Sequence, residues 1–285
     1  MKNKALVGRL ALLCATLIWG SSFFILKNAI DDISVLWVLA IRFLIASVVF
    51  FLFSGRKLIY IGKEGVKGGI TLGFFLAAAY IVQTYGLKYT TPGKNAFLTS
   101  TYCLLVPLMS WILTKKKPKF STLLATIICF TGIGFVSLDS GQDNLNIGDV
   151  LTVLCGFFYA AQIIATDRFV KDCDTVCLSA VEFFVSGIIC LAGAIFFEPA
   201  PSGLDLTAWV SIGYLAVFCT GICFFLQTWA IKYVPPTTAA VLMTTEAVFG
   251  TLFSVIFYHE VLSMSCIIGF LLILIAIIGN ELFNR

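Results

Sequence analysis

Residues 83–89 read QTYGLKY, and residues 227–233 read QTWAIKY. The match continues downstream at an unchanged spacing, with Pro92/Pro236, Ala96/Ala240, Leu98/Leu242 and Thr101/Thr245. An upstream segment aligns at a spacing of its own, with Gly8/Gly148, Trp19/Tyr159, Arg42/Glu182 and Phe43/Phe183. Shared apolar composition does not reproduce Gln-Thr and Lys-Tyr at a fixed spacing, so we infer an internal repeat. We expect the first unit to occupy residues 1–139 and the second residues 140–285.

The composition predicts that both units lie in a membrane. Of the 285 residues, 60% are hydrophobic and only 12% are charged, and the mean hydropathy is +1.01. A soluble domain carries about 25% charged residues, so lipid must cover most of this surface. Backbone groups in lipid are satisfied within one segment, which favours helices, and we therefore predict an all-α integral membrane protein with ten transmembrane helices. The expected spans are residues 8–27, 34–53, 67–87, 92–113, 120–138, 147–166, 175–196, 207–230, 236–256 and 262–282.

Each unit holds five of these spans, and five is an odd number. The second unit must therefore cross the bilayer in the opposite orientation to the first. Such inverted repeats are typical of secondary transporters, with a site near the midplane. Lysine and arginine gather in alternate connections, as at residues 115–119, whereas the opposite connections hold only Lys27, Lys88 and Lys94. Basic connections stay in the cytoplasm, so we expect both termini there, in a multi-pass protein of a bacterial inner membrane.

Several functional classes lack their sequence signals. No GxxxxGK[ST] motif and no continuous basic face occur, which disfavours an ATP-driven pump and a nucleic-acid partner. The ten cysteines lie almost all in apolar stretches without zinc-type pairing, so we expect packed thiols and neither a metal nor another cofactor. An intramembrane enzyme would need a nucleophile, a base and an acid near one face, yet the one histidine, His259, lies in a loop. A non-transporting receptor or scaffold is a further, less favoured alternative, and a monomer and a homodimer are both open.

Five short motifs occur in chain order: LIWGSS at residues 17–22, Arg42-Phe43, PPTTAA at residues 235–240, Glu246, and His259-Glu260. Together with the repeat they resemble the EamA type of the drug/metabolite transporter superfamily, over essentially the whole chain. The resemblance implies a carrier without ATPase parts, often an exporter of amino acids, metabolites or drugs, and it names no substrate. The first unit departs from the pattern, because its fourth span ends in Lys115-Lys116-Lys117 where the second unit has His259-Glu260.

Glu246 is the residue with the clearest functional signal. It lies about ten residues into the ninth span, roughly 15 Å from its end. A carboxylate at that depth costs about 2.5 kcal/mol or more, so it should face a cavity, hold a proton or pair with a cation. We predict that Glu246 couples transport to protons, the alternative being a protonated structural glutamate.

The repeat relates Glu246 to Tyr102, and Trp19 to Tyr159. All four lie near mid-depth, so a pseudo-two-fold axis would bring them around one cavity, for which we also predict Ser22 and Gln162. Aromatic faces beside a carboxylate suit an ammonium group. The predicted function is therefore proton-coupled secondary transport of a small amine-bearing metabolite, such as an amino acid or organic cation, by alternating access. A choline-like importer and a multidrug exporter are the alternatives, and simple aromatic packing is the structural one.

Two further sets of polar residues lie within the spans. Arg42 and Glu182 occupy matched positions with opposite charge, which predicts an interhelical pair with a structural or gating role. Arg42 could instead bind a substrate carboxylate. Gln83, Asn95 and Gln227 lie near span ends, where they are expected to line the entrance of the cavity.

Overall fold

A computed structural model describes residues 2–137, 146–201, 204–258 and 263–283, and throughout these ranges the regular elements are helical. A 3-10 turn, η1 (Gly55–Tyr60), follows α2 (Val35–Ser54), and a π-helical segment, η2 (Leu215–Ile222), joins α9 (Leu206–Tyr214) to α10 (Cys223–Ile231). The α-helices are α1 (Lys2–Asp32), α2 (Val35–Ser54), α3 (Gly62–Lys88), α4 (Pro92–Thr99), α5 (Tyr102–Thr114), α6 (Phe120–Ser137), α7 (Ile147–Phe169), α8 (Thr175–Phe197), α9 (Leu206–Tyr214), α10 (Cys223–Ile231), α11 (Pro236–Met243), α12 (Thr245–Tyr258) and α13 (Met264–Phe283).

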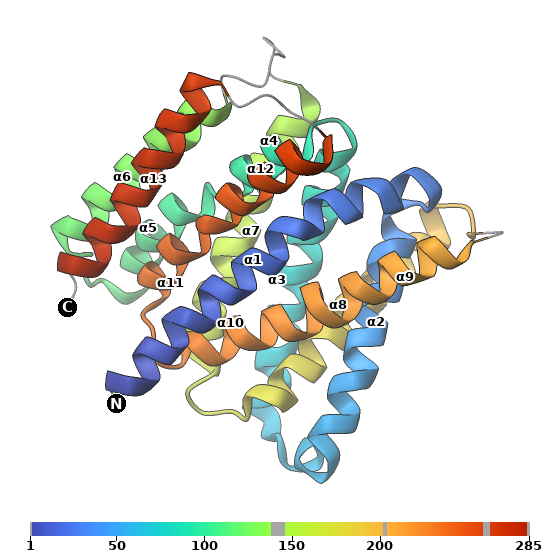
Figure 1. Ribbon diagram of the computed structural model, residues 1–285. Coiled ribbons are helices and arrows are strands. Elements are labelled where there is room, and N and C mark those ends of the chain that lie inside the picture. The colour runs from blue at the N-terminus through green and yellow to red at the C-terminus, as the bar shows by residue number, and fades with distance from the viewer. Residues whose placement is uncertain (1, 138–145, 202–203, 259–262, 284–285) are drawn as a thin grey trace.

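The helices confirm the all-α membrane class. In the described ranges, eight helical segments are long and apolar enough to cross a membrane, and they correspond to eight of the ten predicted spans. The other two, α6 and α13, carry shorter apolar stretches at Phe120–Gly132 and Ile267–Ala276 and pack against each other at one edge of the bundle (Figure 1). The count of ten spans therefore stays a prediction. His259, Glu260 and the boundary between residues 139 and 140 lie outside the described residues.

Two of the predicted spans are broken at matched positions. The fourth is interrupted between α4 and α5 at Ser100 and Thr101, and the ninth between α11 and α12 at Thr244. Hydroxyl side chains bend a helix when they donate to carbonyls of the preceding turn. Ser100 Oγ donates to the Ala96 carbonyl at 3.2 Å, and Thr244 Oγ1 to the Val241 carbonyl at 2.6 Å. Broken helices of this kind build the central sites of transporters.

The elements around the two breaks come from both halves of the chain. Helix α1 runs across the bundle and packs against α10 and α12, while α3 packs against α7 and α8 (Figure 1). The α3–α7 crossing is close because glycines face each other there. A Cβ on Gly86 would lie 2.9 Å from the Gly148 carbonyl oxygen, and a Cβ on Gly148 would lie 2.7 Å from that of Gly86. Small residues let helix backbones approach in this way.

Gly86→Ala should lower the stability of the folded protein. The added methyl group meets backbone atoms that cannot move aside, and overpacking of this kind costs about 1–3 kcal/mol. Gly213→Ala is the matched control, because a Cβ there meets nothing within 4 Å and alanine favours the helix. Thermal unfolding in detergent should show a lower Tm for Gly86→Ala only. An unchanged Tm for Gly86→Ala would contradict the close crossing.

Candidate functional site

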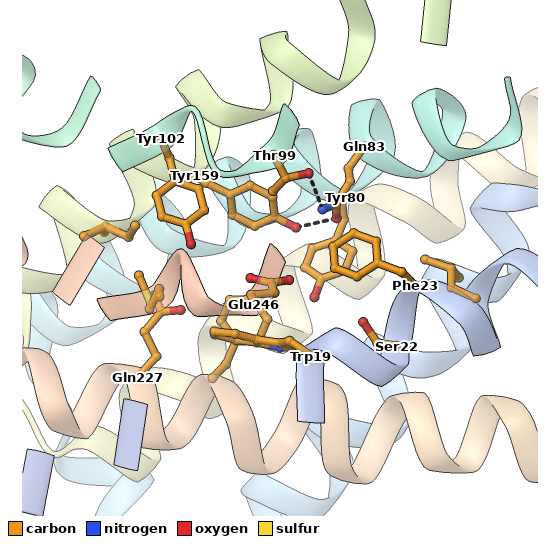
Figure 2. Close-up of a pocket in the computed structure, with 14 residues that line it drawn as sticks. Trp19, Ser22, Phe23, Tyr80, Gln83, Thr99, Tyr102, Tyr159, Gln227 and Glu246 are labelled. Carbon is orange, nitrogen blue, oxygen red and sulfur yellow. Dashed lines mark hydrogen bonds between the residues drawn. The ribbon is translucent and has the colours of Figure 1, made fainter. Parts of the chain in front are cut away.

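One cavity lies where α1, α3, α7 and α10 meet the two helix breaks. The space not filled by atoms is about 480 Å³ when open solvent at the cavity is included, but the centre of a water molecule fits in only about 30 Å³. A solute larger than a few water molecules therefore requires the surrounding helices to move apart. Fourteen residues line it: Trp19, Ser22, Phe23, Leu26, Tyr80, Gln83, Thr99, Tyr102, Tyr159, Ile163, Phe224, Gln227, Met243 and Glu246 (Figure 2).

The lining follows the sequence repeat. The spacing that relates Trp19 to Tyr159 also relates Phe23 to Ile163. The spacing that relates Gln83 to Gln227 gives three more pairs in the same wall: Tyr80/Phe224, Thr99/Met243 and Tyr102/Glu246. Sequence reasoning did not predict three of these pairs: Phe23/Ile163, Tyr80/Phe224 and Thr99/Met243. Extending the two repeat spacings to the neighbouring helical turns would have found them.

Glu246 projects into the middle of this cavity. Its side chain lies between Trp19 on one side and the tyrosines on the other (Figure 2). Only 9% of the residue is exposed, yet in the part of the chain that the structure describes no side chain donates a hydrogen bond to its carboxylate and no cation lies within 4.0 Å. It occupies the first turn of α12, where the helix dipole favours negative charge. The carboxylate is thus left available for a cation or a proton from the cavity.

Trp19 is held by its ring nitrogen, which leaves a face of the indole toward the cavity. Nε1 donates to the carbonyl of Cys219 at 2.8 Å, and the ring packs edge-on against Phe224 with centroids 5.0 Å apart. Cys219 lies within η2, where the hydrogen-bond ladder departs from the α-helical pattern. Such π segments are frequent at functional sites, because the altered ladder makes backbone groups available to other partners.

The opposite wall is a hydrogen-bonded group of aromatic and amide side chains. Tyr159 donates its hydroxyl to Gln83 Oε1 at 2.7 Å, and Gln83 Nε2 donates to Thr99 Oγ1 at 2.9 Å (Figure 2). The ring of Tyr159 lies 5.7 Å from that of Tyr80 and 6.4 Å from that of Tyr102. Both hydrogen-bonding ends of the Gln83 amide are used within the protein, so this wall offers mainly aromatic surface.

Seven of the predicted site residues line the cavity. Two of these, Gln83 and Gln227, were predicted at its entrance. Both belong to the cavity wall. Asn95 lies behind the wall, fully buried, and its Nδ2 donates to the Gln83 carbonyl at 3.2 Å and to Thr152 Oγ1 at 2.7 Å. Gln162 is also absent from the lining and bonds Gln227 from behind. Asn95 and Gln162 are therefore not cavity-lining residues. Each lies on a side of its helix that is turned away from the cavity.

The predicted pair between Arg42 and Glu182 is not made. Arg42 Nε donates to Thr220 Oγ1 at 2.9 Å, and its guanidinium lies 4.6 Å from the centre of the Tyr80 ring. Glu182 instead accepts from Gln162 Nε2 at 2.8 Å. Among the described residues the two charges form no ion pair within 4.0 Å. Arg42 therefore supports the cavity from behind Tyr80, where a cation–π contact offsets part of its burial.

A buried ion pair that sequence reasoning did not predict joins α4 to α7. Lys94 Nζ, at the start of α4, is 2.8 Å from Asp149 Oδ2, at the start of α7, and both side chains are buried. No cluster of three or more histidine, cysteine or acidic side chains that could hold a metal occurs in the described ranges.

Comparison with known proteins gives a consistent family. The EamA-like transporter family matches residues 6–138 and again residues 146–281. An uncharacterized transporter of Archaeoglobus fulgidus is 31% identical over 96% of this chain and 86% of its own length. The uncharacterized transporter YoaV of Bacillus subtilis is 24% identical over 97% of both chains.

A further sequence relative and a solved structure also match most of this chain. The S-adenosylmethionine/S-adenosylhomocysteine transporter of Chlamydia muridarum is 24% identical over 73% of this chain and 71% of its own length. A solved crystal structure shares the fold with a TM-score of 0.81 and 18% identity, covering 100% of this chain and 98% of that chain. With both halves of the sequence matched and a membrane-spanning helical fold around one central cavity, the chain belongs to the EamA-like transporter family of the drug/metabolite transporter superfamily.

Proposed function

We propose that this membrane transporter is a proton-coupled secondary carrier of a small amine-bearing solute. The observation that carries the proposal is the Glu246 carboxylate, which lies in an aromatic cavity without a described hydrogen-bond donor or cation. A carboxylate beside aromatic faces attracts an ammonium group, and a buried carboxylate can exchange that cation for a proton. The substrate and the proton would then compete for the Glu246 carboxylate. Coupled exchange requires such competition.

Alternating access is supported by the matched elements around the cavity. Helix breaks occur at equivalent places in the two halves, and six pairs of repeat-related residues line the same space. The family match falls on two ranges, 6–138 and 146–281, close to the two predicted units. We propose ten spans in two inverted units of five, in the cytoplasmic membrane with both termini inside.

The chemistry of the cavity favours an amino acid or another organic cation over an anion. Its one unpartnered charged group is acidic, among the described lining residues. One relative is named a transporter of S-adenosylmethionine, a compound that carries an ammonium group and a sulfonium centre. A choline-like importer and a multidrug exporter stay the alternatives. We propose no catalytic reaction.

The direct test is uptake by purified protein in proteoliposomes. Radiolabelled amino acids, amines and nucleotide sugars are offered with and without a proton gradient. The proposal expects accumulation of at least one amine that collapses when an ionophore dissipates the gradient, and none of the nucleotide sugars. Transport of nucleotide sugars alone would overturn it.

Trp19→Leu should raise the apparent KM for a transported amine. Loss of a desolvated cation–π contact costs about 0.5–2 kcal/mol, which corresponds to a rise of roughly two- to thirtyfold. Trp209→Leu is the control, since this tryptophan lies exposed on α9. The apparent KM of each variant is obtained from initial uptake rates over a series of substrate concentrations. An unchanged KM for Trp19→Leu and for Tyr159→Leu would argue against the aromatic cavity.

A further inference from the structure

Behind the cavity, three buried polar side chains form a hydrogen-bonded chain. Gln227 Nε2 donates to Gln162 Oε1 at 2.9 Å, and Gln162 Nε2 donates to Glu182 Oε1 at 2.8 Å. Gln162 and Glu182 are fully buried, and Gln227 is 3% exposed. Gln227 reaches the cavity, so the chain links the cavity wall to a second carboxylate inside the protein.

The direction of this chain follows from the chemistry of its inner end. An amide can be turned over to exchange its donor and acceptor ends, whereas a carboxylate oxygen such as Glu182 Oε1 accepts. Glu182 therefore orients the Gln162 amide with its NH₂ group inward and its oxygen outward. That oxygen in turn takes the NH₂ group of Gln227, and the oxygen of Gln227 is left facing the cavity.

The cavity end of the chain lies close to the candidate substrate site. Gln227 and Glu246 line the same cavity, in which Figure 2 labels both side chains. Among the described residues no group donates to Gln227 Oε1. In this cavity the negative end of an amide dipole adds to the negative charge of the carboxylate. The opposite orientation would turn the NH₂ group toward the cavity and weaken the attraction of the cavity for a cation.

We propose that Glu182 is a positioning residue that sets the cation selectivity of the cavity through Gln162 and Gln227. This inference rests on the proposed amine recognition and extends it to a residue that does not touch the substrate. It assigns a role to a buried carboxylate whose second oxygen, Oε2, has no hydrogen-bond partner and which does not pair with Arg42.

The test compares choline with its uncharged isostere 3,3-dimethyl-1-butanol. Binding of each to purified protein in detergent is measured by titration calorimetry for wild type, Glu182→Gln, Gln227→Leu and the double variant. Glu182→Gln keeps the shape but lets the amide chain reverse. It should weaken choline binding by about tenfold or more, because the cation exchanges an attractive amide oxygen for a repulsive NH₂ group in a site poor in water, and leave binding of the isostere unchanged. In the Gln227→Leu background it should have no further effect.

The outcomes separate the inference from the proposed function. Equal weakening of both ligands by Glu182→Gln, additive losses in the double variant, or unchanged choline affinity would each overturn the positioning role. A wild-type protein that binds choline no better than the isostere would overturn this inference, whereas the proposed function fails only if the proteoliposome panel shows transport of nucleotide sugars alone. Thermal unfolding of each variant reports folding separately, and the ligand ratio is unaffected by a merely structural loss.

Discussion

Glu246→Gln is expected to abolish proton-driven accumulation of the substrate while the protein still folds. The glutamine has the same shape but neither binds a proton nor attracts a cation. Removing one partner of a buried charge pair costs about 2–5 kcal/mol, so the affinity for an ammonium substrate should fall roughly thirtyfold to several-thousandfold. In proteoliposomes, uptake by the variant should no longer respond to an imposed pH gradient.

Glu64→Gln is the matched control for this substitution. Glu64 lies exposed in the first turn of α3, away from the cavity, and its replacement should leave gradient-driven uptake unchanged. Folding of Glu246→Gln is checked by its expression and its thermal unfolding. A Glu246→Gln protein whose uptake keeps the wild-type dependence across a pH series would contradict the role of this carboxylate.

Lys94→Met should strongly destabilise the protein. The substitution leaves Asp149 buried with only weaker partners, the Thr90 hydroxyl at 3.3 Å and the backbone N–H of Asn146 at 3.1 Å. An unpaired buried charge costs about 3–5 kcal/mol. The double variant Lys94→Met/Asp149→Asn removes both charges and should recover most of the loss. Thermal unfolding in detergent measures both effects.

Lys171→Met provides the comparison at a surface pair. Lys171 lies 2.9 Å from Asp167, but its side chain is 56% exposed, so this pair contributes about 0–1 kcal/mol. A Tm for Lys94→Met that lies as close to wild type as that of Lys171→Met would show that the Lys94–Asp149 pair is solvated in the folded protein.

The repeat made much of the candidate site predictable. Residues at matched positions face the same axis when the two halves pack together, so Trp19, Tyr102, Tyr159 and Glu246 could be brought to one cavity from spacing alone. The same spacing carried further would have added Tyr80 and its neighbours. The roles of these residues stay predictions until transport is measured.

The polar partners could not be predicted in the same way. Arg42 and Glu182 occupy matched positions with opposite charge, yet each bonds a different neighbour. Gln162 was expected at the substrate and Asn95 at the cavity entrance, but both lie behind the cavity wall. A hydrogen bond forms only within about 3.2 Å and in a narrow range of angles, so a rotation of one helix by a fraction of a turn exchanges one partner for another.

The sequence by itself determined the membrane class, the positions of most spans, the internal repeat and the residues that share a depth in the membrane. These follow from hydrophobicity summed over about 20 residues and from identity at a fixed spacing, both of which are local properties of the chain. Only the tertiary structure decided where the helices break, which glycines let α3 approach α7, and which charge each buried polar group meets. Those features depend on helix rotations and crossing distances, and these are set by the packing of the whole bundle.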